Sequence, residues 1–312
     1  MPTNTSTQTV TPITKTTEKL PGTIEERYSL VQAKIAEAAR KAGRKPADII
    51  LAAVTKYADA DQIRSLLQLG HRDFGENRVQ VLMQHAAMVD EFLARQRLLA
   101  SARKVEAERA APTLFTNPRL LDAAPANAVP PTGGVRWHMI GHLQRNKARK
   151  IIDVVRLIHS VDSLRLAEEL QAIAVRRDRV IEVLLQVNCS GETSKFGCPM
   201  PAAIPLAEQI ATMVNIRLRG VMTIAEHVEQ QADARPTFAR CRELFEEMAG
   251  LGLCDDGRFN ILSMGMSGDY EAAILEGANI IRVGSAIFGD TEPGVAIVEQ
   301  PEPSEPGAEA DL

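Results

Sequence analysis

The 312-residue sequence predicts an α/β fold, a single parallel (β/α)8 TIM barrel. Short runs of apolar and β-branched residues alternate with amphipathic helical patterns along residues 23–290. The runs are continuously apolar, which is typical of parallel strands that are buried on both faces. A doubly wound open sheet would produce the same alternation, and periodicity alone does not separate the two folds.

The elements follow one another in a regular order. An amphipathic helix comes first, because Thr23 and Glu26 have the spacing of a capping box and Gly43 is placed to end the helix. The predicted strands are 50–56, 72–77, 135–141, 157–163, 180–188, 218–224, 259–265 and 279–285. Helical patterns lie between them, for example at 58–70, 143–155, 164–177, 235–252 and 267–277.

Three segments do not fit this alternation of strands and helices. Residues 78–134 are longer than a crossover needs, with a charged helical first part and a Pro/Ala-rich second part, so an insertion is predicted at roughly 92–133, after the second strand. Residues 1–22 are rich in Thr and Pro, and residues 291–312 are acidic and Pro-rich. Both ends are predicted to be disordered tails, because neither has enough apolar side chains to form a core.

Composition excludes several classes of protein. Thirty-six Lys and Arg against 40 Asp and Glu, together with few aromatic residues, argue against nucleic acid as the main partner. No apolar run approaches the ~18–20 residues that span a bilayer, and the first residues lack the pattern of a secretion signal. None of the four cysteines forms a CxxC pair, so neither a disulfide framework nor a metal site is predicted. We therefore expect a cytoplasmic protein without a membrane partner.

Lys56 ends the first predicted strand. Functional residues of such barrels lie at the carboxyl ends of the strands, so this lysine is expected to point into the barrel mouth. Removal from water there would favour the neutral amine that Schiff-base chemistry needs. The alternative is a lysine that extends from a strand end into solvent.

Loops rich in Gly and Ser follow the last two predicted strands, at 263–268 and 284–285. Small residues let backbone N–H groups approach an anion, and barrels often bind phosphate at these two loops. Alternatively, these residues form ordinary turns. Together with Lys56, the loops indicate a phosphorylated aldehyde or ketone bound as an imine. The two ligand classes are pyridoxal 5′-phosphate (PLP) and the sugar phosphate of a lysine-dependent aldolase.

Arg282 lies in an otherwise apolar strand and needs a partner if it is buried. One candidate is a carboxylate at the barrel mouth, such as Glu76. The other is the pyridine nitrogen of PLP, which an arginine would hold in its unprotonated form.

Several ordered motifs carry a resemblance to a known family. They are AVTK at 53–56, FGENRVQ at 74–80, WHMIGHLQRNK at 137–147, HSVDS at 159–163, VNCSGETSKFG at 187–197, LRGVMTI at 218–224, SMGMSGDYEAAILEGAN at 263–279 and IRVGSAIFG at 281–289. In these motifs the sequence resembles the pyridoxal phosphate homeostasis proteins, relatives of the N-terminal barrel of alanine racemase (fold-type III).

The resemblance implies PLP as cofactor, joined to Lys56 as the internal aldimine, with Arg282 at the pyridine nitrogen. It also implies a set of further cofactor-binding residues, some for the phosphate and some beside the ring. These are Asn77, His138, Met222, Ser263, Gly265, Gly284 and Ser285. His138 has an alternative role as a buried core histidine. Lys195 matches a lysine of the family, but the sequence does not indicate what it does.

The sequence favours a carrier over an enzyme, so no catalytic residue is predicted. Racemisation by two bases needs a group on each face of the substrate, and no second domain follows the barrel to supply one. Tyr28, Tyr57 and Tyr270 offer no clear substitute, and Tyr57 is expected to point away from Lys56. We therefore expect a monomer that holds PLP and delivers it, possible recipients being PLP-dependent apo-enzymes. The alternatives are a weak amino-acid racemase, a sugar-phosphate aldolase and an interaction protein without ligand.

Overall fold

The structure is a computed structural model, and it describes residues 22–109, 134–192, 195–226, 231–253 and 257–289. The predicted tails, apart from Gly22, and the Pro/Ala-rich part of the predicted insertion lie outside these residues. Among the described helices, none is long and apolar enough to cross a membrane.

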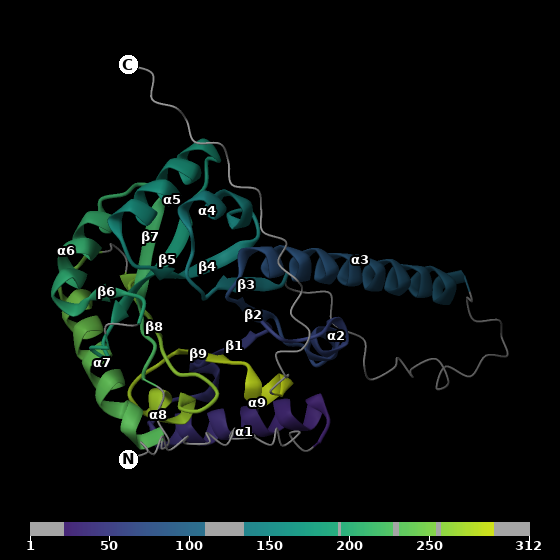
Figure 1. Cartoon of the computed structure of the whole chain (residues 1–312). Coiled ribbons are helices and arrows are strands. Elements are labelled where there is room, and N and C mark those ends of the chain that lie inside the picture. The colour runs from purple at the N-terminus through teal and green to yellow at the C-terminus, as the bar shows by residue number, and fades with distance from the viewer. Residues whose placement is uncertain (1–21, 110–133, 193–194, 227–230, 254–256, 290–312) are drawn as a thin grey trace, which may run out of the picture.

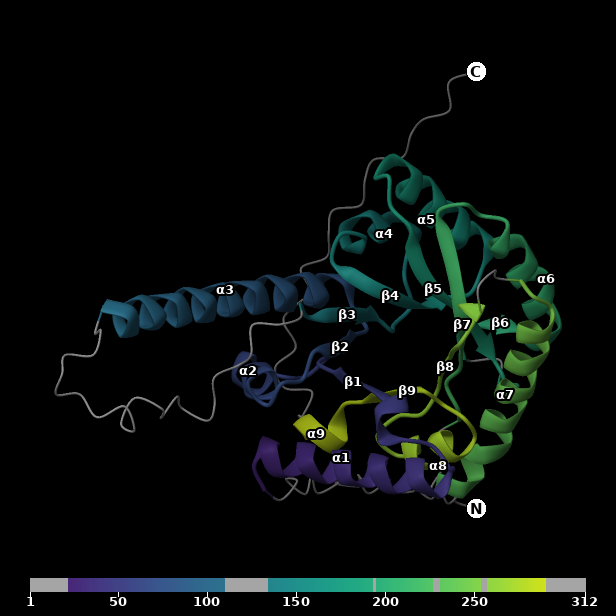
Figure 2. The ribbon, with the colours of Figure 1, turned by 180° about the vertical axis from the view of Figure 1, so that it is seen from behind.

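Parallel strands close into a barrel, as Figures 1 and 2 show from opposite sides. The strands of the barrel are β1 (Ile50–Val54), β2 (Asp73–Glu76), β3 (Arg136–Met139), β4 (Val155–Val161), β5 (Ile181–Asn188), β7 (Ile216–Met222), β8 (Ile261–Ser263) and β9 (Ile280–Val283). Pairing of β1 with β9 and of β4 with β5 closes the ring, which confirms the predicted barrel and excludes the open sheet. The short strand β6 (Cys198–Pro199), which the sequence did not predict, pairs with β5.

Helices surround the barrel (Figure 1). They are α1 (Ile24–Lys41), α2 (Ala60–Gln68), α3 (Val79–Arg109), α4 (Arg145–Ile151), α5 (Leu164–Arg176), α6 (Met200–Ala211), α7 (Arg235–Gly250), α8 (Tyr270–Leu275) and α9 (Ser285–Phe288), with 3₁₀ turns η1 (Pro46–Asp48) and η3 (Gln231–Ala234). The predicted capping box of α1 is present, because Glu26 N donates to Thr23 Oγ1 and Thr23 N donates to Glu26 Oε2.

The helix α3 includes the first part of the predicted insertion. Its early residues Leu82, Ala86 and Val89 are buried, so this part of the helix packs on the barrel. Farther along, Leu98 and Leu99 are exposed, and the helix projects away from the body of the protein (Figures 1 and 2).

The buried apolar side chains form two clusters. The larger one lies where strands and helices pack together and contains Phe74, Trp137 and Phe238. The smaller one contains Ala52, Leu157, Leu184, Met222 and Ile280, which come from strands all around the ring. Because side chains of a strand alternate between its two faces, the smaller cluster fills the barrel interior. The interior therefore has few apolar side chains, and buried polar side chains share it.

His71 connects α1 to the start of β2. Its Nε2 lies 2.7 Å from the carbonyl oxygen of Asp73, so Nε2 donates and Nδ1 accepts from the Tyr28 hydroxyl at 3.1 Å. Burial lowers the pKa of His71 to about 4, which keeps the ring neutral in the folded protein.

We predict that this histidine makes the protein less stable in mild acid. The unfolded state takes up a proton near pH 6.5 and the folded state only near pH 4, so the contribution of His71 is complete above pH 6.5 and is lost as the pH falls towards 4. The loss is about 3 kcal/mol in the free energy of unfolding. Urea titrations from pH 7 to 4 should show a smaller loss for His71→Gln, whereas the half-exposed His142→Gln should match the wild type. An equal loss in all three proteins would contradict this account.

Candidate functional site

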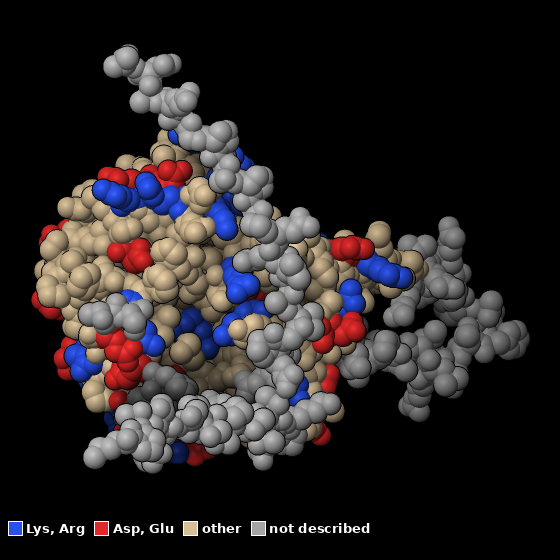
Figure 3. Space-filling view, in the orientation of Figure 1, with Lys and Arg blue, Asp and Glu red and all other residues tan. Residues whose placement is uncertain are grey.

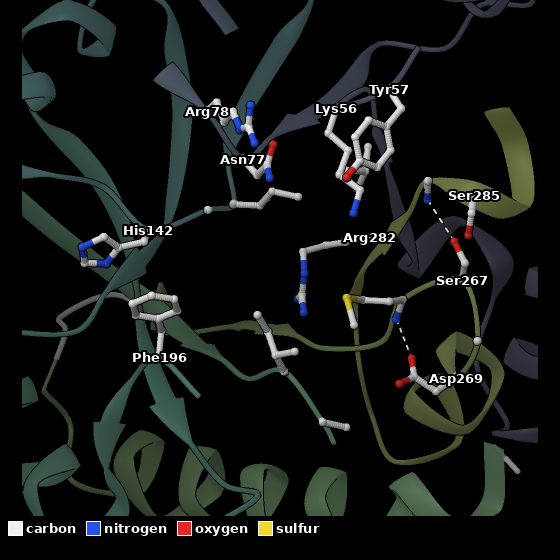
Figure 4. Close-up of a pocket in the computed structure, with 18 of the residues that line it drawn as sticks. Lys56, Tyr57, Asn77, Arg78, His142, Phe196, Ser267, Asp269, Arg282 and Ser285 are labelled. Atoms are coloured by element: carbon white, nitrogen blue, oxygen red, sulfur yellow. Dashed lines mark hydrogen bonds between the residues drawn. The ribbon is translucent and has the colours of Figure 1, made fainter. Parts of the chain in front are cut away.

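A cavity of about 730 Å³ lies at the carboxyl end of the barrel. Its walls come from the ends of the strands and the loops after them, and Figure 3 shows lysine and arginine side chains beside the hollow on this face. Five of the predicted site residues line it: Lys56, Asn77, Arg282, Gly284 and Ser285. Figure 4 shows the side chains of Lys56, Asn77 and Ser285 around the same space, with Arg282 in its middle.

Lys56 follows β1 and lines the cavity. Its side chain is exposed, so the structure does not show the removal of this amine from water that the sequence predicted. Its Nζ lies 4.9 Å from the centre of the Tyr57 ring, a cation–π contact. Tyr57 lines the same cavity and is 60% exposed. The prediction that Tyr57 points away from Lys56 was therefore wrong, because the chain leaves β1 and turns before it reaches α2.

Arg282 in β9 is a buried cation with 3% of its surface exposed. Its Nη1 donates to Ser263 Oγ at 2.7 Å and its Nη2 donates to the Thr223 carbonyl at 2.8 Å. Burial lowers the pKa of Arg282 to about 10, so the guanidinium remains charged at neutral pH. These bonds hold the charged group against the cavity.

Glu76 is not the partner of Arg282. Its Oε1 accepts from the Thr55 hydroxyl at 2.6 Å and lies 3.1 Å from Nδ1 of His85 on α3. Because α3 packs outside the barrel, the Glu76 side chain is on the outer face of β2. The structure therefore excludes Glu76 as an ion-pair partner of Arg282.

The last two loops bring backbone donors together, as predicted for an anion site. The Oγ of Ser267 accepts from the N–H of Gly284 at 3.1 Å, a bond drawn in Figure 4, and from the N–H of Ala286 at 3.3 Å. Two amide donors therefore converge on one oxygen, an arrangement that suits a phosphate oxygen. Sequence reasoning noted the loop that contains Ser267 but did not select this residue.

Four predicted residues lie outside the cavity lining: His138, Met222, Ser263 and Gly265. The first three point into the barrel but are buried below the cavity floor. Ser263, for example, lies beneath Arg282 and accepts a hydrogen bond from it. Gly265 has a φ of +93°, and a Cβ there would lie 2.6 Å from the Cβ of Ala273, so this glycine serves packing against α8.

Loops on the opposite side of the cavity contribute residues that the sequence analysis missed. His142 and Phe196 stack with ring centres 4.8 Å apart, and Arg78 reaches the cavity from the loop after β2 (Figure 4). Gly141 lets two of these loops touch, since a Cβ there would lie 2.2 Å from the Asn77 carbonyl oxygen. Lys195 also lines the cavity, with Nζ 3.8 Å from Glu192. The rule that strand-end loops form the site would have found His142, Phe196 and Arg78, whereas Lys195 was singled out in the sequence without a role.

Comparison with known proteins identifies the family. Residues 100–292 match the family "Alanine racemase, N-terminal domain". A pyridoxal phosphate homeostasis protein of Pseudomonas aeruginosa is 38% identical over 272 residues, which cover 87% of this chain and 97% of the relative. The chain belongs to the pyridoxal phosphate homeostasis protein family.

Solved structures agree with this membership. A protein of unknown function from Bifidobacterium adolescentis is 35% identical, with a TM-score of 0.68, over 87% of this chain and 99% of its own. PipY from Synechococcus elongatus, solved with PLP bound, is 28% identical, with a TM-score of 0.63, over 86% of this chain and 100% of its own. The homeostasis protein family predicted from the sequence motifs is thus confirmed, as is its alanine racemase-like barrel.

We predict different effects on the free energy of unfolding for substitutions of two buried serines. Ser263→Ala removes an acceptor of the buried Arg282 and should lower the free energy of unfolding by about 2 kcal/mol. The matched control is Ser160→Ala in β4, because the Ser160 hydroxyl is equally buried but has no hydrogen-bond partner among the described residues. Removal of the Ser160 hydroxyl should leave the free energy of unfolding unchanged or raise it. Urea unfolding measures both, and equal effects would contradict the assignment.

Proposed function

We propose that this chain binds PLP in the cavity and acts in vitamin B6 homeostasis, by holding the coenzyme reversibly and delivering it. The names of the curated relatives and the PLP-bound structure of PipY support this function. The single observation in this structure that carries it is the placement of the Lys56 amine, the buried Arg282 guanidinium and Ser267 with its two amide donors around a common cavity.

Each of these groups suits one part of PLP. Lys56 offers the primary amine that condenses with an aldehyde, and the Gly284 and Ala286 amides, which donate to Ser267 Oγ in this structure, suit a phosphate oxygen in its place. Arg282 can only donate hydrogen bonds, so it suits an unprotonated pyridine nitrogen. PLP bound in this way would supply an aldehyde carbon able to form a reversible imine with Lys56 Nζ. Asn77 and Ser285, which line the same cavity, are proposed as further contacts.

The exposure of Lys56 and Tyr57 favours a carrier. Both side chains are open to solvent, so water and amines can reach the bond between coenzyme and lysine. An enzyme that controls a reactive PLP adduct needs the opposite arrangement, with water excluded. We propose that recipient apo-enzymes obtain the coenzyme from this open state, and that the protein acts as a monomer in the cytoplasm.

The proximity of Tyr57 to Lys56 is the one observation that favours a weak racemase. A phenol near the lysine amine supplies a second acid–base group, but racemisation requires the two groups on opposite faces of the substrate. Lys56 and Tyr57 are consecutive residues and the ammonium lies over the phenol ring, so both approach from the same wall. The carrier function therefore remains the better fit. A sugar-phosphate aldolase fits less well, because its substrate has no ring nitrogen for Arg282.

We predict that reduction traps the coenzyme on Lys56. Protein incubated with PLP should develop an imine absorption band, and borohydride should fix the pyridoxyl group on the peptide that contains Lys56. Lys56→Ala should lose this adduct, whereas Lys195→Ala, which removes another amine of the same cavity, should retain it. Absence of any adduct in the wild type would overturn the proposed imine, and an adduct on Lys195 would overturn its position.

We predict that Arg282→Gln weakens PLP binding about 10- to 100-fold, the usual effect of losing a hydrogen bond from a charged group. The fold should survive, because glutamine can still donate to the Thr223 carbonyl. Arg240→Gln is a matched control, since Arg240 also donates to a carbonyl and a hydroxyl, those of Cys189 and Thr237, but lies outside the cavity lining. PLP titrations followed by absorbance measure both. Unchanged affinity in Arg282→Gln would contradict the assignment.

A further inference from the structure

A chain of hydrogen-bonded side chains runs from Arg282 through the barrel interior. Arg282 Nη1 lies 2.7 Å from Ser263 Oγ, which lies 2.9 Å from His159 Nδ1. His159 Nε2 then lies 2.9 Å from His138 Nδ1, and His138 Nε2 lies 3.2 Å from Asp73 Oδ1. Each of these side chains is buried, and they come from β9, β8, β4, β3 and β2.

The position of every proton in this series of hydrogen bonds follows from Arg282, where the series begins. A guanidinium has no acceptor, so Arg282 donates to Ser263 and the serine hydroxyl is left to donate to His159 Nδ1. An imidazole that accepts at Nδ1 has its proton on Nε2, so His159 donates to His138. His138 in turn accepts at Nδ1 and donates from Nε2 to the carboxylate of Asp73. All donors point in one direction, and both imidazoles are neutral.

The reverse direction is unfavourable at both ends. If His138 donated to His159 and His159 to Ser263, the serine hydroxyl would have no acceptor in the chain. His138 Nε2 would then face the Asp73 carboxylate with a lone pair, unless the ring took up a second proton. A second proton on that ring would place another cation in an interior that already buries Arg282, and burial together with this guanidinium holds the pKa of His159 well below its usual value.

Asp73 is a suitable final acceptor. Burial opposes its ionisation, but hydrogen bonds from His138 and Arg136 outweigh that effect and lower its pKa to about 2. Its two oxygens accept from Nε and Nη2 of Arg136, whose side chain is 48% exposed. Asp73 and Arg136 begin β2 and β3, so this ion pair lies at the amino end of the barrel, whereas the cavity lies at the carboxyl end.

We propose that Ser263, His159, His138 and Asp73 are positioning residues that form a one-way hydrogen-bond relay to Arg282. The relay holds the guanidinium in place beneath the cavity and couples ligand affinity to an ion pair at the far end of the barrel. The coupling to affinity rests on the proposed function, in which Arg282 contacts PLP. The direction of the relay is a property of the chain alone.

The first test determines the proton positions in the wild-type chain without PLP. Nitrogen-15 NMR of protein labelled at histidine should show a scalar coupling through the hydrogen bond between two imidazole rings. Both coupled rings should have the proton on Nε2 and a bare Nδ1 at neutral pH. A proton on Nδ1 of either ring, a doubly protonated ring or the absence of the coupling would overturn the relay. This test needs no variant and no ligand, so it remains decisive if PLP does not bind.

The second test measures coupling across the barrel. Asp73→Asn removes the charge that accepts from His138 and should weaken PLP binding about three- to tenfold without any change in the cavity. Glu182→Gln is the matched control, because Glu182 is also 9% exposed, lies near the start of a strand and pairs with Arg156 and Arg219, but is not in the relay. Its affinity for PLP should equal that of the wild type. Unchanged affinity in Asp73→Asn, or an equal loss in Glu182→Gln, would overturn the coupling.

If the wild type itself binds no PLP, the proposed function fails and the NMR result alone decides the relay. If Asp73→Asn does not fold, His138→Gln replaces it in the titration, since glutamine does not reproduce both ring nitrogens. The same loss of affinity is then expected, and wild-type affinity would overturn the proposal.

Discussion

The buried guanidinium of Arg282 dictates how the interior of this barrel is built. A cation among buried strands is tolerated only where hydrogen bonds replace its hydration, and here the Ser263 hydroxyl and the Thr223 carbonyl do so. The serine hydroxyl then needs an acceptor of its own, which His159 provides. One charged side chain thus accounts for polar residues in a space that other barrels fill with aliphatic side chains. Closure of the ring brings these residues, which are distant in sequence, to a common axis.

The sequence was sufficient for the fold and for part of the site. The carboxyl ends of parallel strands meet at one rim, so Lys56, Arg282, Gly284 and Ser285 could be selected from their places after or within predicted strands. The family resemblance added Asn77, and all five line the cavity. The sequence did not indicate how deep each side chain lies along the barrel axis. His138, Met222 and Ser263 were expected to contact the cofactor. They point into the barrel but lie below the cavity lining, because the stagger between neighbouring strands sets the height of each side chain and leaves no local signal in the sequence.

Loop conformation was the second quantity that the sequence did not provide. Ser267 accepts from the Gly284 and Ala286 amides because two loops from different strands meet, and neither loop alone indicates that contact. Tyr57 was misplaced for the same reason, since alternation along a strand no longer applies once the chain has left β1. The open position of Tyr57 beside Lys56 matters for function, because it places both groups on one wall of an exposed mouth. That geometry suits reversible capture of an aldehyde better than chemistry on both faces of a bound substrate.

The most direct test of the central claim is a crystal structure of this protein grown with excess PLP. We predict continuous density between the coenzyme and Lys56 Nζ, the ring nitrogen within hydrogen-bond distance of Arg282, and the phosphate at the Gly284 and Ala286 amides beside Ser267. Coenzyme bound elsewhere, or bound in this cavity with its phosphate away from those amides and its ring away from Arg282, would contradict the account.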